Sequence, residues 1–77
     1  MRRIFVSTVV RFDADGNVTP MWIEWTNGEK YKIDKIVTVT RSSALHSDMG
    51  YRYLVLIRNQ ERELGFDGHR WFVQDHG

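Results

Sequence analysis

TPMWIEWTNGEKYKI, residues 19–33, carries two β-type runs on either side of Asn27-Gly28. In the first run Met21, Ile23 and Trp25 take alternate positions, and this period of two is typical of a strand with one buried face. Asn-Gly is the strongest short signal for a hairpin, because both central residues of a type I′ turn need positive φ. The run-turn-run pattern therefore predicts two antiparallel strands joined by a tight turn.

The rest of the chain continues this pattern on both sides of the hairpin. Turn signals stand at residues 13–17, 59–60 and 67–68, and a longer polar loop covers residues 41–50. The pieces between the turns are rich in β-branched and aromatic residues and predict six strands: residues 2–12, 18–26, 30–40, 51–58, 62–66 and 70–74. Six short strands with hairpin-length connections predict an all-β meander. A sheet of this size buries one face by curling, so we expect a small SH3-like or related, partly open barrel.

A charged residue interrupts the third predicted strand. Ile36 breaks the alternation set by Tyr31 and Ile33, and Asp34 stands at the point where the phase shifts. A bulge there would change the direction of the strand. We expect the Asp34 carboxylate to accept hydrogen bonds from backbone N–H groups. The bulkiest apolar residues that share a phase within their strands predict the core: Ile23, Trp25, Tyr31, Ile33, Tyr53, Val55 and Trp71.

Length and composition limit the class of protein. Seventy-seven residues predict one domain, residues 1–77, which is too small for a full α/β enzyme fold. A hydrophobic content of 42% and a charged content of 27% are ordinary globular values. Cysteine is absent, whereas a secreted domain of this size usually has disulfides, so we expect a cytoplasmic protein. No apolar run approaches the roughly 20 residues of a membrane helix, and no membrane partner is expected.

The polar residues form no pattern that indicates an enzyme. One polar loop, residues 42–48, holds serines, His46 and an aspartate, but nothing in it would fix them as a catalytic triad requires. Asp13 and Asp15 begin like a calcium loop, but the sixth position is Val18 rather than the glycine of an EF-hand, so a β-turn is predicted. We expect a non-enzymatic protein without a cofactor or a metal site.

Two of the predicted strands are apolar on both faces. Phe5 and Val9 lie opposite the main apolar face of the first strand, and Leu54 and Leu56 do so in the fourth. Strands of this kind are covered on both sides, either because the sheet curls on itself or because a partner covers the second face. The second alternative predicts a protein-interaction patch, used by a homodimer or by another protein, that consists of Phe5, Val9, Leu54, Leu56 and Phe72.

Basic and aromatic residues keep a second class of function open. Small β-barrels that bind single-stranded nucleic acid combine cations with aromatic rings on which bases stack. The candidate contacts in this chain are Trp22, Lys30, Lys32, Arg52 and Arg58. Acidic residues interleave with them, and the net charge of +1 lacks the electrostatic footprint of a nucleic-acid-binding domain. The alternative function is therefore weak nucleic-acid binding, with an affinity that falls steeply as salt rises.

One motif spans the hairpin and its flanks, P-x-x-I-x-W-x-x-G-x-x-Y-x-I-D-x-I over residues 20–36, and Tyr53 and Trp71 follow it. With this motif the chain resembles a group of small uncharacterised bacterial β-domains. Some members are free-standing, and similar segments are appended to larger proteins, including some related to translesion DNA polymerases. The resemblance implies a bacterial origin and a compact β fold, and it carries no activity, ligand or catalytic residue over to this chain.

Overall fold

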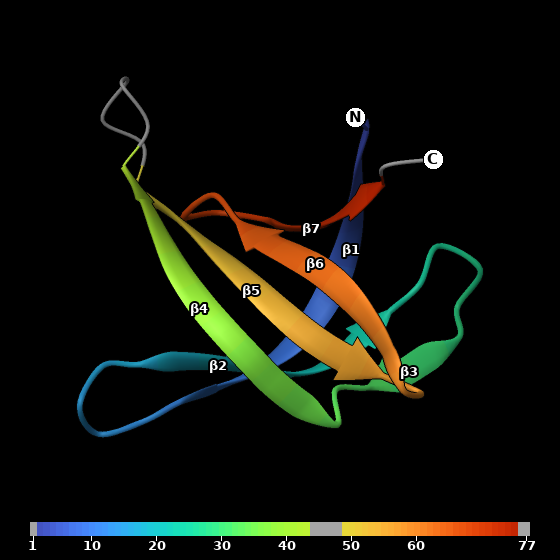
Figure 1. Ribbon diagram of the computed structural model, residues 1–77, viewed down its shortest axis with the longest axis horizontal. Coiled ribbons are helices and arrows are strands. Elements are labelled where there is room, and N and C mark those ends of the chain that lie inside the picture. The colour runs from blue at the N-terminus through green and yellow to red at the C-terminus, as the bar shows by residue number, and fades with distance from the viewer. Residues whose placement is uncertain (1, 44–48, 76–77) are drawn as a thin grey trace.

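The computed structural model describes residues 2–43 and 49–75, which form seven antiparallel β-strands and no helix (Figure 1). The strands are β1 (Arg2–Phe12), β2 (Val18–Glu24), β3 (Lys30–Lys32), β4 (Lys35–Ser43), β5 (Met49–Ile57), β6 (Gln60–Phe66) and β7 (Trp71–Asp75). They pair in the order β3-β2-β1-β7-β6-β5-β4. None of the described residues belongs to a helix that is long and apolar enough to cross a membrane.

The connection between β3 and β4 requires the sheet to curl. These strands stand at opposite ends of the strand order, yet only Ile33 and Asp34 separate them in the chain. An extended residue spans about 3.5 Å, so two residues bridge the edges only if the edges lie close together. Figure 1 shows the resulting shape, in which β4, β5 and β6 cross over β1 and β2. The predicted all-β, partly open barrel is confirmed.

The predicted third strand, residues 30–40, is in fact two strands that belong to opposite edges of the sheet. The chain leaves β3 at Ile33, whose N–H donates to the Met21 carbonyl oxygen, and enters β4 at Lys35. Between them the Asp34 N–H donates to the Leu56 carbonyl oxygen, and the Asp34 carboxylate accepts the Arg58 N–H. The count of six strands was wrong, whereas the predicted role of the Asp34 carboxylate is confirmed.

The core fills the inner face of the curled sheet. It consists of Ile23, Ile33, Tyr53, Val55, Ile57, Leu64, Trp71 and Val73. Trp25 and Tyr31, which we predicted in the core, are half-buried and pack against it from the end of the β2–β3 hairpin. The Tyr53 hydroxyl donates a hydrogen bond of 2.9 Å to the Val18 carbonyl oxygen and so ties β5 to the start of β2 across the core.

The turn at Asn27-Gly28 differs in type from the prediction. Gly28 has the expected positive φ, +88°, and β2 pairs with β3, so the hairpin itself is confirmed. Asn27 is not among the residues with positive φ, and the turn closes through a hydrogen bond from the Gly28 N–H to the Trp25 carbonyl oxygen. The two consecutive positive φ angles of a type I′ turn lie instead at Arg58 and Asn59, between β5 and β6.

Candidate functional site

Two residues of the predicted interaction patch, Phe5 and Phe72, meet on the outer face of the sheet. They oppose each other in the β1–β7 ladder, and their rings form an edge-to-face pair with centroids 5.8 Å apart. The Arg3 guanidinium lies over the Phe72 ring at 4.4 Å, and that of Arg70 lies over the Phe5 ring at 3.9 Å. Phe5 remains 40% exposed, whereas Phe72 is buried, with only 9% of its surface exposed. The predicted exposure of Phe72 was therefore wrong.

Gly65 explains why the Phe72 ring is buried. Gly65 opposes Phe72 in the β6–β7 ladder, and a Cβ atom at position 65 would overlap the ring. The ring lies in the space that a side chain would occupy, directly against the backbone of β6. The sequence singles out Gly65 as a glycine inside a strand, but it does not identify the aromatic ring that covers it.

The other three patch residues stand apart from Phe5 and Phe72. Val9 is 60% exposed and opposes Trp22, which is 41% exposed, on the outer face of β1 and β2. Leu54 and Leu56 are half-buried on the outer face of β5, where β6 places Glu63 and Glu61 opposite them. The five residues therefore form three separate groups, and the curl of the sheet does not bury this face.

The predicted nucleic-acid contacts are also divided. Lys32 opposes Trp22 and Lys30 opposes Glu24, so the two lysines and the tryptophan lie on neighbouring strands of one surface. The Arg52 Nε atom lies 2.9 Å from a carboxylate oxygen of Glu63, which neutralises its charge. Arg58 lies in the β5–β6 turn, with its guanidinium 4.9 Å from the centre of the Tyr31 ring. The structure brings together three of the five residues rather than a continuous basic stripe.

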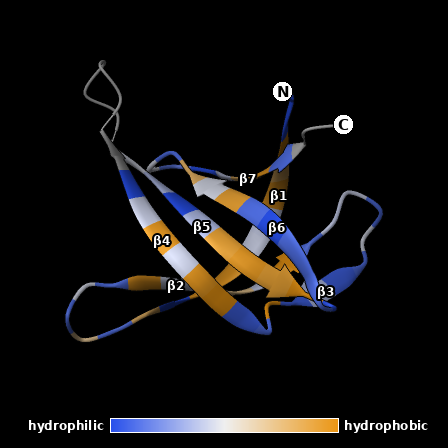
Figure 2. Ribbon diagram, in the orientation of Figure 1, coloured by the Kyte–Doolittle hydropathy of each residue, from blue (hydrophilic) through white to orange (hydrophobic). Residues whose placement is uncertain are grey.

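β4 forms one edge of the sheet, and only its β5 side is paired within the described residues. The register shifts between Ile36 and Thr38, and from Thr38 to Ser43 the pairing with β5 is regular. Val37 is 40% exposed and Val39 is 53% exposed. Figure 2 shows apolar segments along β4 between hydrophilic ends, and residues 36–40 are uncharged and all β-branched. The other edge strand, β3, has only three residues.

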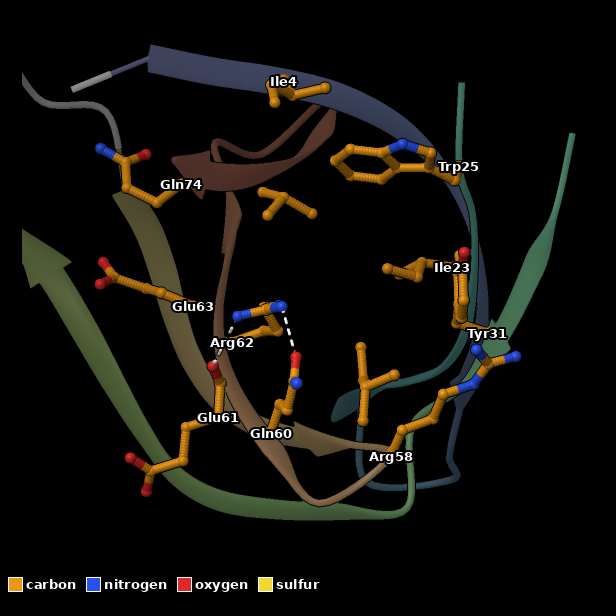
Figure 3. A pocket seen from close by; sticks show the side chains of 12 residues that line it. Ile4, Ile23, Trp25, Tyr31, Arg58, Gln60, Glu61, Arg62, Glu63 and Gln74 are labelled. Atoms are coloured by element: carbon orange, nitrogen blue, oxygen red, sulfur yellow. Dashed lines mark hydrogen bonds between the residues drawn. The ribbon is translucent and has the colours of Figure 1, made fainter. Parts of the chain in front are cut away.

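A cavity of about 710 Å³ opens between the β5–β6 hairpin and the end of the β2–β3 hairpin. Its walls are the apolar side chains of Ile4, Ile23, Trp25, Ile57 and Val73. The polar side chains at its rim are those of Tyr31, Arg58, Gln60, Glu61, Arg62, Glu63 and Gln74 (Figure 3). We call this cavity the barrel mouth. It exists because β6 pairs with β7 only over Leu64–Phe66, so residues 60–63 stand away from β7.

Two arginines of the barrel mouth have no carboxylate partner among the described residues. Arg62 opposes the fully buried Val55, so it occupies a position of β6 that faces inward. Its Nη2 atom donates to the Gln60 side-chain oxygen at 2.6 Å, and its Nη1 atom lies 3.5 Å from the Glu61 carbonyl oxygen. The Arg58 guanidinium lies against the Tyr31 ring. Arg58 was predicted as a nucleic-acid contact, whereas Arg62 was not predicted as a site residue. Its signal in the sequence is a charged residue in the same alternation as the apolar Leu64 and Phe66.

The Tyr31 hydroxyl at this rim remains a hydrogen-bond donor at neutral pH. It donates to a Glu29 carboxylate oxygen at 2.5 Å. This hydrogen bond, together with smaller contributions from burial and from the Glu29 charge, raises the pKa of Tyr31. The phenol therefore adds no negative charge to the barrel mouth.

Comparisons with protein-family models, with curated proteins and with solved structures find no significant match. His46, His76 and most of the polar loop at residues 42–48 lie outside the described residues. Among residues 2–43 and 49–75, no three histidine or acidic side chains come together in a way that would hold a metal ion. The candidate sites are therefore the β4 edge, the outer face and the barrel mouth, and each rests on its own geometry.

Proposed function

We propose that this protein is a non-enzymatic interaction module of the bacterial cytoplasm that forms a homodimer by pairing β4 with β4 of a second copy. The observation that supports this proposal is the long edge of β4, which pairs with β5 and with no other strand among the described residues. The unpaired N–H and C=O groups of an edge strand are a template for another strand. Exposed Val37 and Val39 add apolar surface to that template.

The rest of the edge favours pairing as well. Proteins commonly protect an edge strand with charges, proline or a bulge. β4 has charged side chains only near its ends, at Lys35 and Arg41, and its single register shift lies at Val37. From Thr38 to Ser43 the strand is regular and contains no proline or glycine. A second copy supplies an edge of the same length and chemistry, and a two-fold axis places the same strand on both sides of the interface.

Dimerisation would also add stability that a domain of this size lacks. A core in a domain of fewer than about 80 residues rarely supplies more than roughly 3–5 kcal/mol of net stability, and small domains add disulfides, metals or oligomerisation. This chain has no cysteine. Pairing two β4 strands would extend the sheet and cover Val39, which shares the inner face of the sheet with Tyr53.

Sedimentation equilibrium at micromolar protein concentration tests the proposal. We expect a species of twice the 9.1 kDa chain mass that dissociates on dilution. Val39→Lys places a charge on the β4 edge at an exposed position, so it should yield folded monomers. The matched control is Val9→Lys, which introduces the same charge at another exposed valine, on the outer face of β1. The Val9→Lys protein should remain dimeric.

Three outcomes would contradict this assignment. A single 9.1 kDa species at every concentration would exclude self-association. Dissociation by Val9→Lys or Leu54→Glu but not by Val39→Lys would place the interface on the outer face. Binding of single-stranded nucleic acid that weakens steeply with salt and is lost on Lys32→Gln would favour the alternative function, with Trp22 and Lys32 as its contacts.

A further inference from the structure

We infer that the barrel mouth is a binding site for a small aromatic carboxylate, with the ring held among the apolar walls and the carboxylate on Arg62. A volume of about 710 Å³ lies within the range of roughly 300–1,000 Å³ that is typical of small-molecule sites. None of the residues that line the cavity belongs to β4. The inference is therefore independent of dimerisation through that strand.

The walls favour an apolar, flat ligand body. Ile4, Ile23, Ile57 and Val73 converge on the cavity from β1, β2, β5 and β7, and Trp25 forms one side (Figure 3). Trp25 is only half-buried, because no side chain of the described residues fills the space in front of its ring. An aromatic ring in this space would pack against the indole in an offset or edge-to-face arrangement.

The rim favours a single negative charge. Arg62 faces inward from β6, and Figure 3 shows its side chain directed into the cavity from the side opposite Ile23. Among the described residues its hydrogen-bond partners are neutral oxygens of Gln60 and Glu61, so its guanidinium keeps N–H groups available for an acceptor. A guanidinium binds a carboxylate through two parallel hydrogen bonds, which fixes the orientation of a planar acid.

The remaining charges of the rim limit the ligand to a monoanion. Arg58 adds a second positive charge beside Tyr31, and the Glu29 carboxylate that accepts the Tyr31 hydroxyl adds a negative one. Glu63 is paired with Arg52, which lies on the outer face. Glu61 opposes Leu56 and so stands on the outer face. Arg58 and Arg62 against Glu29 leave one net positive charge, which complements a carboxylate better than a doubly charged phosphate.

Isothermal titration calorimetry with 2-naphthoate and its neutral isostere 2-naphthamide tests this inference. We expect naphthoate to bind and naphthamide to bind at least about tenfold more weakly, because charge-assisted hydrogen bonds are about twice as strong as neutral ones. Arg62→Gln keeps a polar side chain at an exposed position, so the fold should be retained. It should weaken naphthoate about tenfold and leave naphthamide unchanged. The matched control is Arg11→Gln, at an exposed position of β1 that does not line the cavity, and it should leave both affinities unchanged.

The amide spectrum of ¹⁵N-labelled protein supplies a second measurement that a general effect on folding would not imitate. Naphthoate should shift the Trp25 indole N–H resonance and leave that of Trp22, on the outer face, in place. The inference is overturned if the acid and the amide bind equally, if Arg11→Gln weakens naphthoate as much as Arg62→Gln does, or if no binding is detected at millimolar ligand.

Discussion

The Asp34 Oδ2 atom accepts a hydrogen bond of 3.1 Å from the backbone N–H of Arg58, and this contact joins the link between β3 and β4 to the turn between β5 and β6. Arg58 has a φ of 53° and Asn59 one of 62°. A left-handed conformation costs a residue with a side chain roughly 1–2 kcal/mol, and arginine gains no local hydrogen bond there. The carboxylate of Asp34 holds this conformation in place, and the same residue fixes the crossing from one edge of the sheet to the other.

Asp34→Ala should lower the free energy of unfolding by about 1–2 kcal/mol, because it removes the acceptor of the Arg58 N–H. Asp34→Asn is the matched control: its side-chain oxygen still accepts a hydrogen bond, so the loss should be smaller. Urea denaturation followed by tryptophan fluorescence measures both. Equal stability of the alanine variant and the wild type would show that the turn holds its conformation without Asp34.

The sequence predicted the strands and most of the core because alternation depends only on neighbouring residues. It identified Ile23, Ile33, Tyr53, Val55 and Trp71 as buried, and each is. It predicted a bulge at Asp34 but not the separation into two strands, because the N–H group that donates to the Asp34 carboxylate lies 24 residues away. Local periodicity cannot distinguish a bulge within one strand from a crossing between two edges.

The candidate sites were harder to predict for a related reason. Alternation places Phe5 and Phe72 on the outer face, but it does not say that Arg3 and Arg70 cover their rings. The exposure of the two rings depends on these contacts. Each contact pairs a residue near the start of the chain with one near its end, so local alternation cannot predict it. Arg62 was open to prediction, because it is a charged residue at an inward position of β6.

Gly65→Ala should destabilise the protein by about 1–2 kcal/mol, because the new methyl group displaces the Phe72 ring from its place on β6. In a Phe72→Ala background the same substitution should stabilise it by about 0.5–1 kcal/mol, since alanine is favoured over glycine within a strand. Chemical denaturation of the four proteins in this double-mutant cycle measures the coupling. Equal effects of Gly65→Ala in both backgrounds would mean that the ring does not depend on the glycine.

Trp71→Ala should destabilise the protein by about 3–5 kcal/mol, as expected for a buried tryptophan. Trp71 is 9% exposed, stacks on Phe66 at 4.5 Å and contacts the Tyr53 ring at 5.4 Å. Trp25→Ala should cost less, about 2 kcal/mol, because Trp25 is half-buried beside the barrel mouth. Thermal unfolding midpoints of the two variants give the order. A larger loss for Trp25→Ala would mean that the barrel mouth is closed in solution.

Tyr53→Phe should change the response of the protein to alkaline pH. Burial, and to a smaller extent the neighbouring Tyr51, raise the pKa of Tyr53 above its ordinary value of 10.0. The stability that depends on the protonated phenol is fully present below the unfolded-state pKa and is lost as pH rises through the raised folded-state pKa. At pH 7 the variant should be less stable than the wild type by about 0.5–1.5 kcal/mol, because the hydrogen bond to the Val18 carbonyl oxygen is gone.

Above pH 10 the difference between Tyr53→Phe and the wild type should narrow, because only the wild type has to keep this buried phenol protonated. Tyr31→Phe is the comparison: the pKa of the Tyr31 phenol is also raised, mainly by the Glu29 carboxylate, so the substitution has an effect of the same sign. The effect should be smaller than that of Tyr53→Phe, because solvent screens the Tyr31–Glu29 contact. Urea denaturation from pH 7 to about pH 11 measures all three proteins. A parallel decline of Tyr53→Phe and wild type over that range would show that Tyr53 ionises as readily in the folded protein as in the unfolded chain.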